Sequence, residues 1–141
     1  MKKATRRATR LTAAALGAVL VGGQAVALSA GATAATPSYA KLSITASSEH
    51  PGYYNVVVSG HFTSNAFATT VGMRLKGDDP WFNDDLGVSA TGTAYYGDFS
   101  LYALVWHGTL NEDWEGRDEI FASVSSSSGW RADTPNVNGY Y

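Results

Sequence analysis

Between residues 40 and 124, apolar and polar side chains alternate with a period of two, and this pattern constrains the fold more than any other feature of the chain. Residues 40–46 place Ala, Leu, Ile and Ala on one face and Lys, Ser and Thr on the other. Successive side chains of a β-strand point to opposite faces, so the alternation predicts strands with one buried face. No window of helical length carries the i, i+3, i+4 apolar stripe of an amphipathic helix. The chain is therefore expected to be all-β.

The alternation recurs in six further segments, with turn residues between them roughly every ten positions. The segments are residues 54–62, 71–76, 86–90, 99–105, 120–124 and a ragged stretch from 130 to 141 that is broken near Pro135. About seven short strands with this spacing predict an antiparallel two-sheet sandwich. Its core should include the apolar residues that share the inward face: Leu42, Ile44, Val56, Val58, Leu101, Val105, Ile120 and Val124.

Residues 1–35 have the layout of a secretory signal peptide. A basic start is followed by an apolar, small-residue run over residues 11–28, and Ala32-Thr33-Ala34 offers an A-x-A cleavage site. The leader also resembles those of exported actinomycete proteins. Arg6-Arg7 raises the twin-arginine route, and an uncleaved transmembrane anchor is a further alternative; glycines and a glutamine interrupt the apolar run, which favours cleavage. We expect Sec-type export and a single extracellular domain over residues 36–141.

Removal of this leader would leave a strongly acidic protein. Residues 36–141 hold five basic and 12 acidic residues, a formal net charge of −7. Such a surface repels phosphate backbones and anionic lipids, so nucleic acid and membranes are poor partners. The chain has no cysteine, which excludes a disulfide framework, a thiolate metal site and a cysteine nucleophile.

Short motifs in the second half of the chain resemble those of bacterial immunoglobulin-like domains. The run Gly97-Asp98-Phe99-Ser100-Leu101 is similar to their "G-x-F-S-L" strand, and residues 118–124 are similar to their "I-x-A-x-V" strand. Upstream, residues 56–60 match their early "V-x-V-x-G" pattern. The resemblance spans roughly residues 40 to 140. It implies an immunoglobulin-like sandwich, and such domains are mostly binding or spacer modules.

Nine of the 12 acidic residues lie in two segments, residues 77–85 and 111–119. If successive strands are antiparallel, both segments leave the sandwich at the same end, where crowded carboxylates would attract a cation. Calcium is the natural candidate because it prefers oxygen ligands on loops; the alternative is that the segments are simply solvated connections. The predicted calcium ligands are Asp78, Asp79, Asp84, Asp85, Asn111, Asp113 and Glu115.

Aromatic residues supply the candidate ligand-binding surface. Trp81, Phe82 and Trp114 lie within the two acidic segments, where they either cap the core or form a platform for a sugar ring or a partner protein. Tyr102 and Trp106 alternate with the inward residues of their strand, so they should form an outward strip that is covered by a loop, pairs with a partner or binds a ligand.

Signals of catalysis are weak. His50, His61 and His107 are scattered, and the chain has neither an H-E-x-x-H pattern nor a G-x-S-x-G elbow. We therefore expect a non-enzymatic, secreted module that binds an extracellular protein or glycan. The alternative is a calcium-stabilised structural protein that assembles at the cell surface through exposed strand edges.

Overall fold

Antiparallel strands make up most of the domain. The computed structural model describes residues 35–79, 83–111 and 116–141, which all belong to one compact unit. In chain order the elements are β1 (Tyr39–Ala46), β2 (Tyr53–His61), β3 (Ala68–Asp78), β4 (Asn83–Tyr95), β5 (Asp98–Trp106), α1 (His107–Leu110), β6 (Asp118–Ser126), β7 (Arg131–Asp133) and β8 (Val137–Gly139). The all-β fold that the alternation predicts is confirmed.

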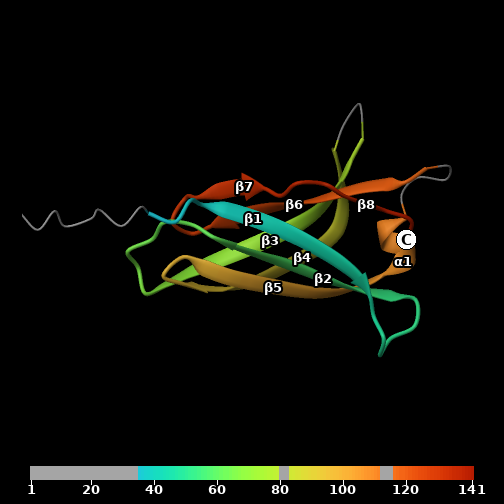
Figure 1. The fold of residues 1–141 in the computed structure, drawn as a ribbon, viewed down its shortest axis with the longest axis horizontal. Coiled ribbons are helices and arrows are strands. Elements are labelled where there is room, and N and C mark those ends of the chain that lie inside the picture. The colour runs from blue at the N-terminus through green and yellow to red at the C-terminus, as the bar shows by residue number, and fades with distance from the viewer. Residues whose placement is uncertain (1–34, 80–82, 112–115) are drawn as a thin grey trace, which may run out of the picture. The chain divides into compact units, whose positions relative to one another are not determined.

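The strands form one hydrogen-bonded sheet in the order β1-β2-β5-β4-β3-β6-β7, and β8 also pairs with β6 (Figure 1). The edge strand β1 contacts β6, β7 and β8, so the sheet curls into a nearly closed, barrel-like arrangement. The junction with the fewest paired residues lies between β4 and β5, which share a single pair, Tyr95 with Asp98. The face enclosed by the curled sheet is the apolar core.

The strand register places the predicted core residues together. Leu42 pairs with Val58, and Val58 pairs with Leu101 across β1, β2 and β5. Of the eight residues expected in the core, all but Ile44 are buried, and Ile44 is partly buried against the others. Burial of these aliphatic side chains supplies the main driving force for folding.

β4 is longer than the sequence indicates. It has 13 residues, whereas the alternation predicts only residues 86–90. The inward-facing residues from Leu86 to Gly92 are only half-buried, and β5 pairs with β4 only at its end. Several of these residues are also small, so the alternation of apolar and polar residues is weak in this strand. The acidic segment of residues 77–85 is consequently not a simple loop: β3 continues to Asp78, and Gly77 pairs with Asp84 in the hairpin.

The last strand is divided in two, so the sheet has eight strands in the described ranges rather than seven. β7 pairs with residues 123–125 of β6, and β8 pairs with residues 118–120. Pro135 lies between them, where its missing N–H cannot continue a ladder. The sequence does not predict the four-residue helix α1. None of the described residues forms a helix long and apolar enough to span a membrane.

The turn between β4 and β5 has only two residues. Tyr96 and Gly97 both have positive φ, of 51° and 91°, as a type I′ hairpin turn requires. A Cβ at Gly97 would overlap the carbonyl group of Phe62. Only glycine therefore fits there, and this turn ties the end of β2 to the start of β5.

Candidate functional site: an aromatic face on β2 and β5

The outward strip predicted on β5 is present. Tyr102 and Trp106 are 57% and 45% exposed, and they point away from the core, on the opposite face from Leu101 and Val105. In the register of β2 and β5, Trp106 pairs with Tyr53 and Tyr102 pairs with Val57. The strip therefore extends onto the neighbouring strand. We call the outward side chains of Tyr53, Asn55, Val57, Tyr102, Leu104 and Trp106 the aromatic face.

The indole ring of Trp106 is held in place although nearly half of it is exposed. The ring of Tyr53 meets it edge-on, with centroids 5.2 Å apart and planes at 64°. The imidazole of His107 lies 4.2 Å from it. Gly52 and Gly108 both border the ring, and a Cβ at Gly108 would lie only 2.9 Å from Nε1. An exposed ring that is fixed before binding loses little entropy when a ligand stacks on it.

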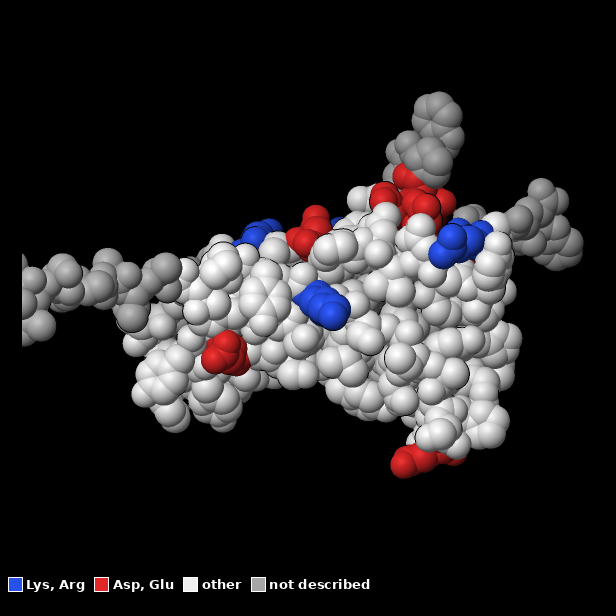
Figure 2. Space-filling view, viewed as in Figure 1, with Lys and Arg blue, Asp and Glu red and all other residues white. Residues whose placement is uncertain are grey.

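Tyr102 is also oriented by a neighbour. Its hydroxyl donates a 2.8 Å hydrogen bond to Oδ1 of Asn55 on β2. On the three strands β1, β2 and β5, the outward positions hold only Lys41 and Asp98 as formally charged residues. Figure 2 shows this largely uncharged surface over β1, β2 and β5. The aromatic face thus combines apolar rings with neutral hydrogen-bonding groups.

Acidic side chains gather on the β3–β4 hairpin (Figure 2). Asp85 accepts a 2.8 Å bond from Arg74 and a 2.9 Å bond from the main-chain N–H of Gly87. The Gly87 bond first, and then the Arg74 guanidinium, lower the pKa of Asp85. Asp78 accepts a 2.6 Å bond from the side chain of Asn136. Two of the four predicted calcium ligands on this hairpin therefore have protein partners.

Residues 118 and 119 of the second acidic segment lie at the same end of the domain as this hairpin, since Gly77 pairs with the adjacent Ile120. Residues 136–141 connect the two segments: Asn136 bonds to Asp78, and the Asn111 amide donates a 3.1 Å bond to the main-chain oxygen of Tyr141. Asp113 and Glu115 lie outside the described residues. Within the described part of the chain, no three His, Asp or Glu side chains form a group suited to a metal ion. The calcium site stays a prediction.

Three of the aromatic residues proposed for ligand binding, Trp81, Phe82 and Trp114, also lie outside the described residues. The signal peptide predicted for residues 1–35 lies outside them too, apart from Ala35 itself. Of the predicted ligand-binding set, the structure thus places Tyr102 and Trp106, and it brings both onto one face.

One histidine forms a pair that resembles part of a catalytic site. Nδ1 of His61 lies 2.8 Å from Oδ1 of Asp98, its partner across β2 and β5. A hydrolytic triad needs a hydroxyl or thiol on the other ring nitrogen. Among residues 35–79, 83–111 and 116–141, no such group is hydrogen-bonded to His61. The pair is a surface cross-strand contact.

The structure adds an exposed aromatic cluster that the sequence did not indicate. The rings of Phe67 and Tyr95 lie 5.4 Å apart, as do those of Phe67 and Tyr96, and all three side chains are exposed. Adjacent tyrosines beside the turn at Gly97 were the only signal, and their pairing with Phe67 depends on the tertiary fold. This cluster lies at the end of β4 and on the turns beside it, whereas the aromatic face lies on two paired strands.

Comparisons with protein-family models, with curated proteins and with solved structures found no match to this chain.

Proposed function

We propose that this chain is an exported, non-catalytic module that binds a glycan outside the cell through its aromatic face. The observation that carries the proposal is the exposed, fixed indole of Trp106, with Tyr102 four positions along the same strand. Sugar rings present an apolar face that stacks on aromatic rings, and their hydroxyls bond to neutral polar groups such as the Asn55 amide. The scarcity of charge on this face favours a neutral glycan.

The proposed fold is an immunoglobulin-like sandwich. Support comes from the strand order: with strands lettered in chain order, β1-β2-β5 corresponds to A-B-E of one immunoglobulin sheet and β3-β6-β7 to C-F-G of the other, although the fourth strand pairs along most of its length with β3 and not with β5. The single residue pair between β4 and β5 gives a natural point at which two layers would separate. In this arrangement the aromatic face is the outer surface of one layer.

Extracellular location belongs to the same proposal. It rests on the leader-like residues 1–35. The net charge of −7 over residues 36–141 disfavours nucleic acid and anionic membranes as partners. N-terminal sequencing of secreted material should give Ala35 or Thr36. Recovery of an intact Met1 on membrane-bound protein would overturn export.

Affinity electrophoresis through gels that contain neutral soluble polysaccharides, such as xylan or mixed-linkage glucan, tests the binding function. Trp106→Ala should weaken binding by roughly thirtyfold, because truncating a central aromatic anchor costs about 2 kcal/mol. Tyr102→Ala should weaken it less. Tyr96→Ala removes an exposed aromatic ring outside the face and is the control. Unchanged binding by Trp106→Ala, or binding of proteins but of no polysaccharide, would contradict the proposal.

A second candidate is a calcium-stabilised structural protein that assembles through strand edges. The observation in its favour is that β4 and β5 share only one residue pair. Along the rest of their length, the backbone groups of the two strands do not bond to each other and could pair with a strand of another copy. Assembly predicts a mass that rises with protein concentration in sedimentation experiments. A constant monomer mass in calcium would exclude it.

A further inference from the structure

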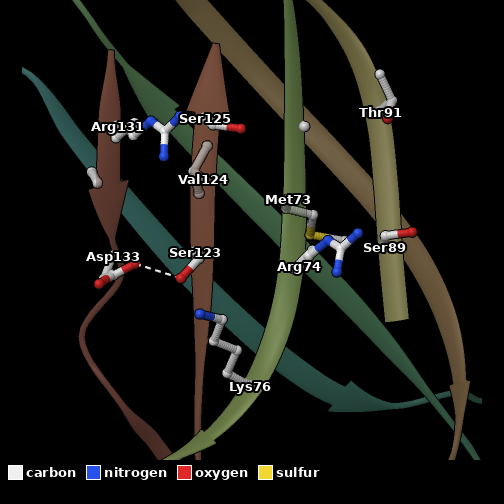
Figure 3. Close-up of a pocket in the computed structure, with 12 residues that line it drawn as sticks. Met73, Arg74, Lys76, Ser89, Thr91, Ser123, Val124, Ser125, Arg131 and Asp133 are labelled. Atoms are coloured by element: carbon white, nitrogen blue, oxygen red, sulfur yellow. Dashed lines mark hydrogen bonds between the residues drawn. The ribbon is translucent and has the colours of Figure 1, made fainter. Parts of the chain in front are cut away.

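A groove crosses the outer face of β4, β3, β6 and β7, which lie side by side in Figure 3. Its volume is about 670 Å³, within the range of sites that hold small ligands. Three cationic side chains line it, namely Arg74 and Lys76 from β3 and Arg131 from β7. Four hydroxyl side chains line it as well: Ser89, Thr91, Ser123 and Ser125.

The strand register explains why these residues meet. Arg74 pairs with Ser89 on β4 and with Ser123 on β6, and Ser123 pairs with Asp133 on β7. One row away, Gly72 of β3 pairs with Thr91 and Ser125, and Ser125 pairs with Arg131. Residues two apart on a strand share a face, so the two rows form one surface. Gly72 has no side chain, which hollows the middle of its row.

The charge of this groove is opposite to that of the domain. Residues 36–141 contain five Lys and Arg against 12 Asp and Glu, yet three of the five cations line this one groove. Asp133 is the only acidic residue among the lining residues, and it accepts a 2.6 Å bond from Ser123. Arg74 is bridged to Asp85 at 2.8 Å, whereas neither Lys76 nor Arg131 forms an ion pair with another described residue. The groove is thus complementary to an anion.

We propose that this groove binds the carboxylate groups of an acidic polysaccharide, at a second site separate from the aromatic face. Arginine donates paired hydrogen bonds that fit a carboxylate. The serine and threonine hydroxyls both donate and accept, so they match the hydroxyl groups of a sugar chain between its charges. A bound acidic peptide would call for exposed apolar or aromatic anchors; the lining residues include no aromatic side chain, and of the apolar ones Met73 and Val124 are buried and Ala132 is small. This site goes beyond the neutral-glycan function proposed above and does not depend on it.

Isothermal titration at low salt with polygalacturonate tests the proposal, with its methyl ester as the uncharged counterpart. The parent protein should bind the acid form and not the ester. Arg131→Gln should weaken binding by roughly tenfold or more, as expected for loss of a charge-assisted hydrogen bond. Lys41→Gln removes the same charge from the opposite layer and should have little effect.

Two further variants act on the groove without removing a cation. A Cβ at Gly72 would meet only Thr91 Oγ1 at 3.6 Å and the Ala90 carbonyl oxygen at 3.7 Å, which are ordinary contacts. Gly72→Val should therefore fold normally and block the groove. Asp85→Asn keeps an acceptor for the Gly87 N–H and releases Arg74 from its carboxylate, so it should strengthen binding severalfold.

The outcomes separate the alternatives. Equal binding of acid and ester, equal weakening by Lys41→Gln and Arg131→Gln, or no binding at low salt would each overturn the proposal. Tighter binding of poly-L-glutamate than of polygalacturonate would overturn the assignment of a polysaccharide as the ligand and would indicate an acidic peptide instead. Trp106→Ala should leave polygalacturonate binding intact; loss of binding in that variant would mean that one site, the aromatic face, accounts for both ligands.

Discussion

Gly52 lies directly against the indole ring of Trp106, so closely that a Cβ at Gly52 would be 2.5 Å from the ring carbon Cζ3. The contact joins the turn after β1 to the end of β5, and the main-chain N–H of His107 donates a 2.9 Å bond to the Gly52 carbonyl oxygen beside it. Gly52 also has a φ of 81°, a conformation that favours glycine. The turn therefore fixes the position of the main residue of the aromatic face.

Gly52→Ala should both destabilise the domain and displace the Trp106 ring. The positive φ costs of order 1–3 kcal/mol for a residue with a side chain, and the added methyl group overlaps the ring. Urea unfolding measures the first effect, and polysaccharide affinity measures the second. Gly129→Ala is the matched control, because Gly129 has a φ of 92° with nothing within 4 Å of the added Cβ. Equal loss of affinity in both variants would contradict the positioning role of Gly52.

The register of β2 predicts that truncation of two adjacent valines will cost different amounts of stability. Val58 is fully buried, whereas Val57 faces outward and is only partly buried. Val58→Ala should lower the free energy of unfolding by about 2–4 kcal/mol, as should Ile120→Ala, because each leaves a cavity in the core. Val57→Ala should cost clearly less. Chemical denaturation checks all three, and a larger loss at Val57 than at Val58 would show that the register is wrong.

The sequence predicts the parts of this fold in which the core imposes strict alternation. Val56, Val58, Leu101 and Ile120 face a continuous apolar core, so their pattern has period two and their strands could be placed. β4 was not predicted beyond residues 86–90 because residues 83–85 are exposed and polar, and the inward residues after Ala90 are Gly92 and Ala94, which are too small to give a clear apolar pattern. The hairpin extension to Asp78 and Asn83 pairs polar residues beyond the core, where hydropathy gives no signal.

Likewise, only part of the candidate site could be predicted from the sequence. Tyr102 and Trp106 could be assigned to an outward strip because they alternate with buried Leu101 and Val105 on one strand. The contribution of Tyr53 and the support from Gly52 required the pairing of β2 with β5. The groove around Arg74 and Arg131 depends on contacts across four strands, which no local pattern in the sequence encodes.

Tyr141 should make stability fall at alkaline pH. Its ring meets that of Tyr54 at 5.2 Å, and burial first, then the Asp118 carboxylate, raise the pKa of Tyr141 above 10.0. Because the folded-state pKa is raised, this stabilisation is fully present below pH 10 and is lost as pH rises through the folded value. As the pH rises above about 10, the parent should lose more stability than Tyr141→Phe. Tyr140→Phe, at an exposed neighbouring residue, controls for the loss of one phenol; parallel curves for parent and Tyr141→Phe would refute the effect.

Asp85 should affect the stability of the domain at acidic pH. Its pKa is below the ordinary value of 3.8, mainly through the Gly87 N–H and then Arg74. A lowered pKa gives stability that is present above pH 3.8 and is lost as pH falls through the folded-state value. At about pH 6 the Tm of Asp85→Asn should be lower than that of the parent, and this difference in Tm should narrow at about pH 3. Because the side chain is solvent-exposed, the shift in Tm should be small. A gap that widens in acid would contradict the assignment.

Calcium should raise the Tm if the two acidic segments bind it at their shared end of the domain. A cation bound only by the folded state stabilises by RT ln(1 + [L]/Kd), about 2.7 kcal/mol at a hundredfold excess over Kd. Asp79→Asn and Asp84→Asn should each reduce the rise, whereas Glu49→Gln removes a carboxylate from the turn between β1 and β2, outside the predicted ligand set, and should not. Thermal unfolding in millimolar calcium and in chelator is the measurement. Identical curves in the two solutions would mean that these carboxylates serve only their protein partners, such as Arg74 for Asp85 and Asn136 for Asp78.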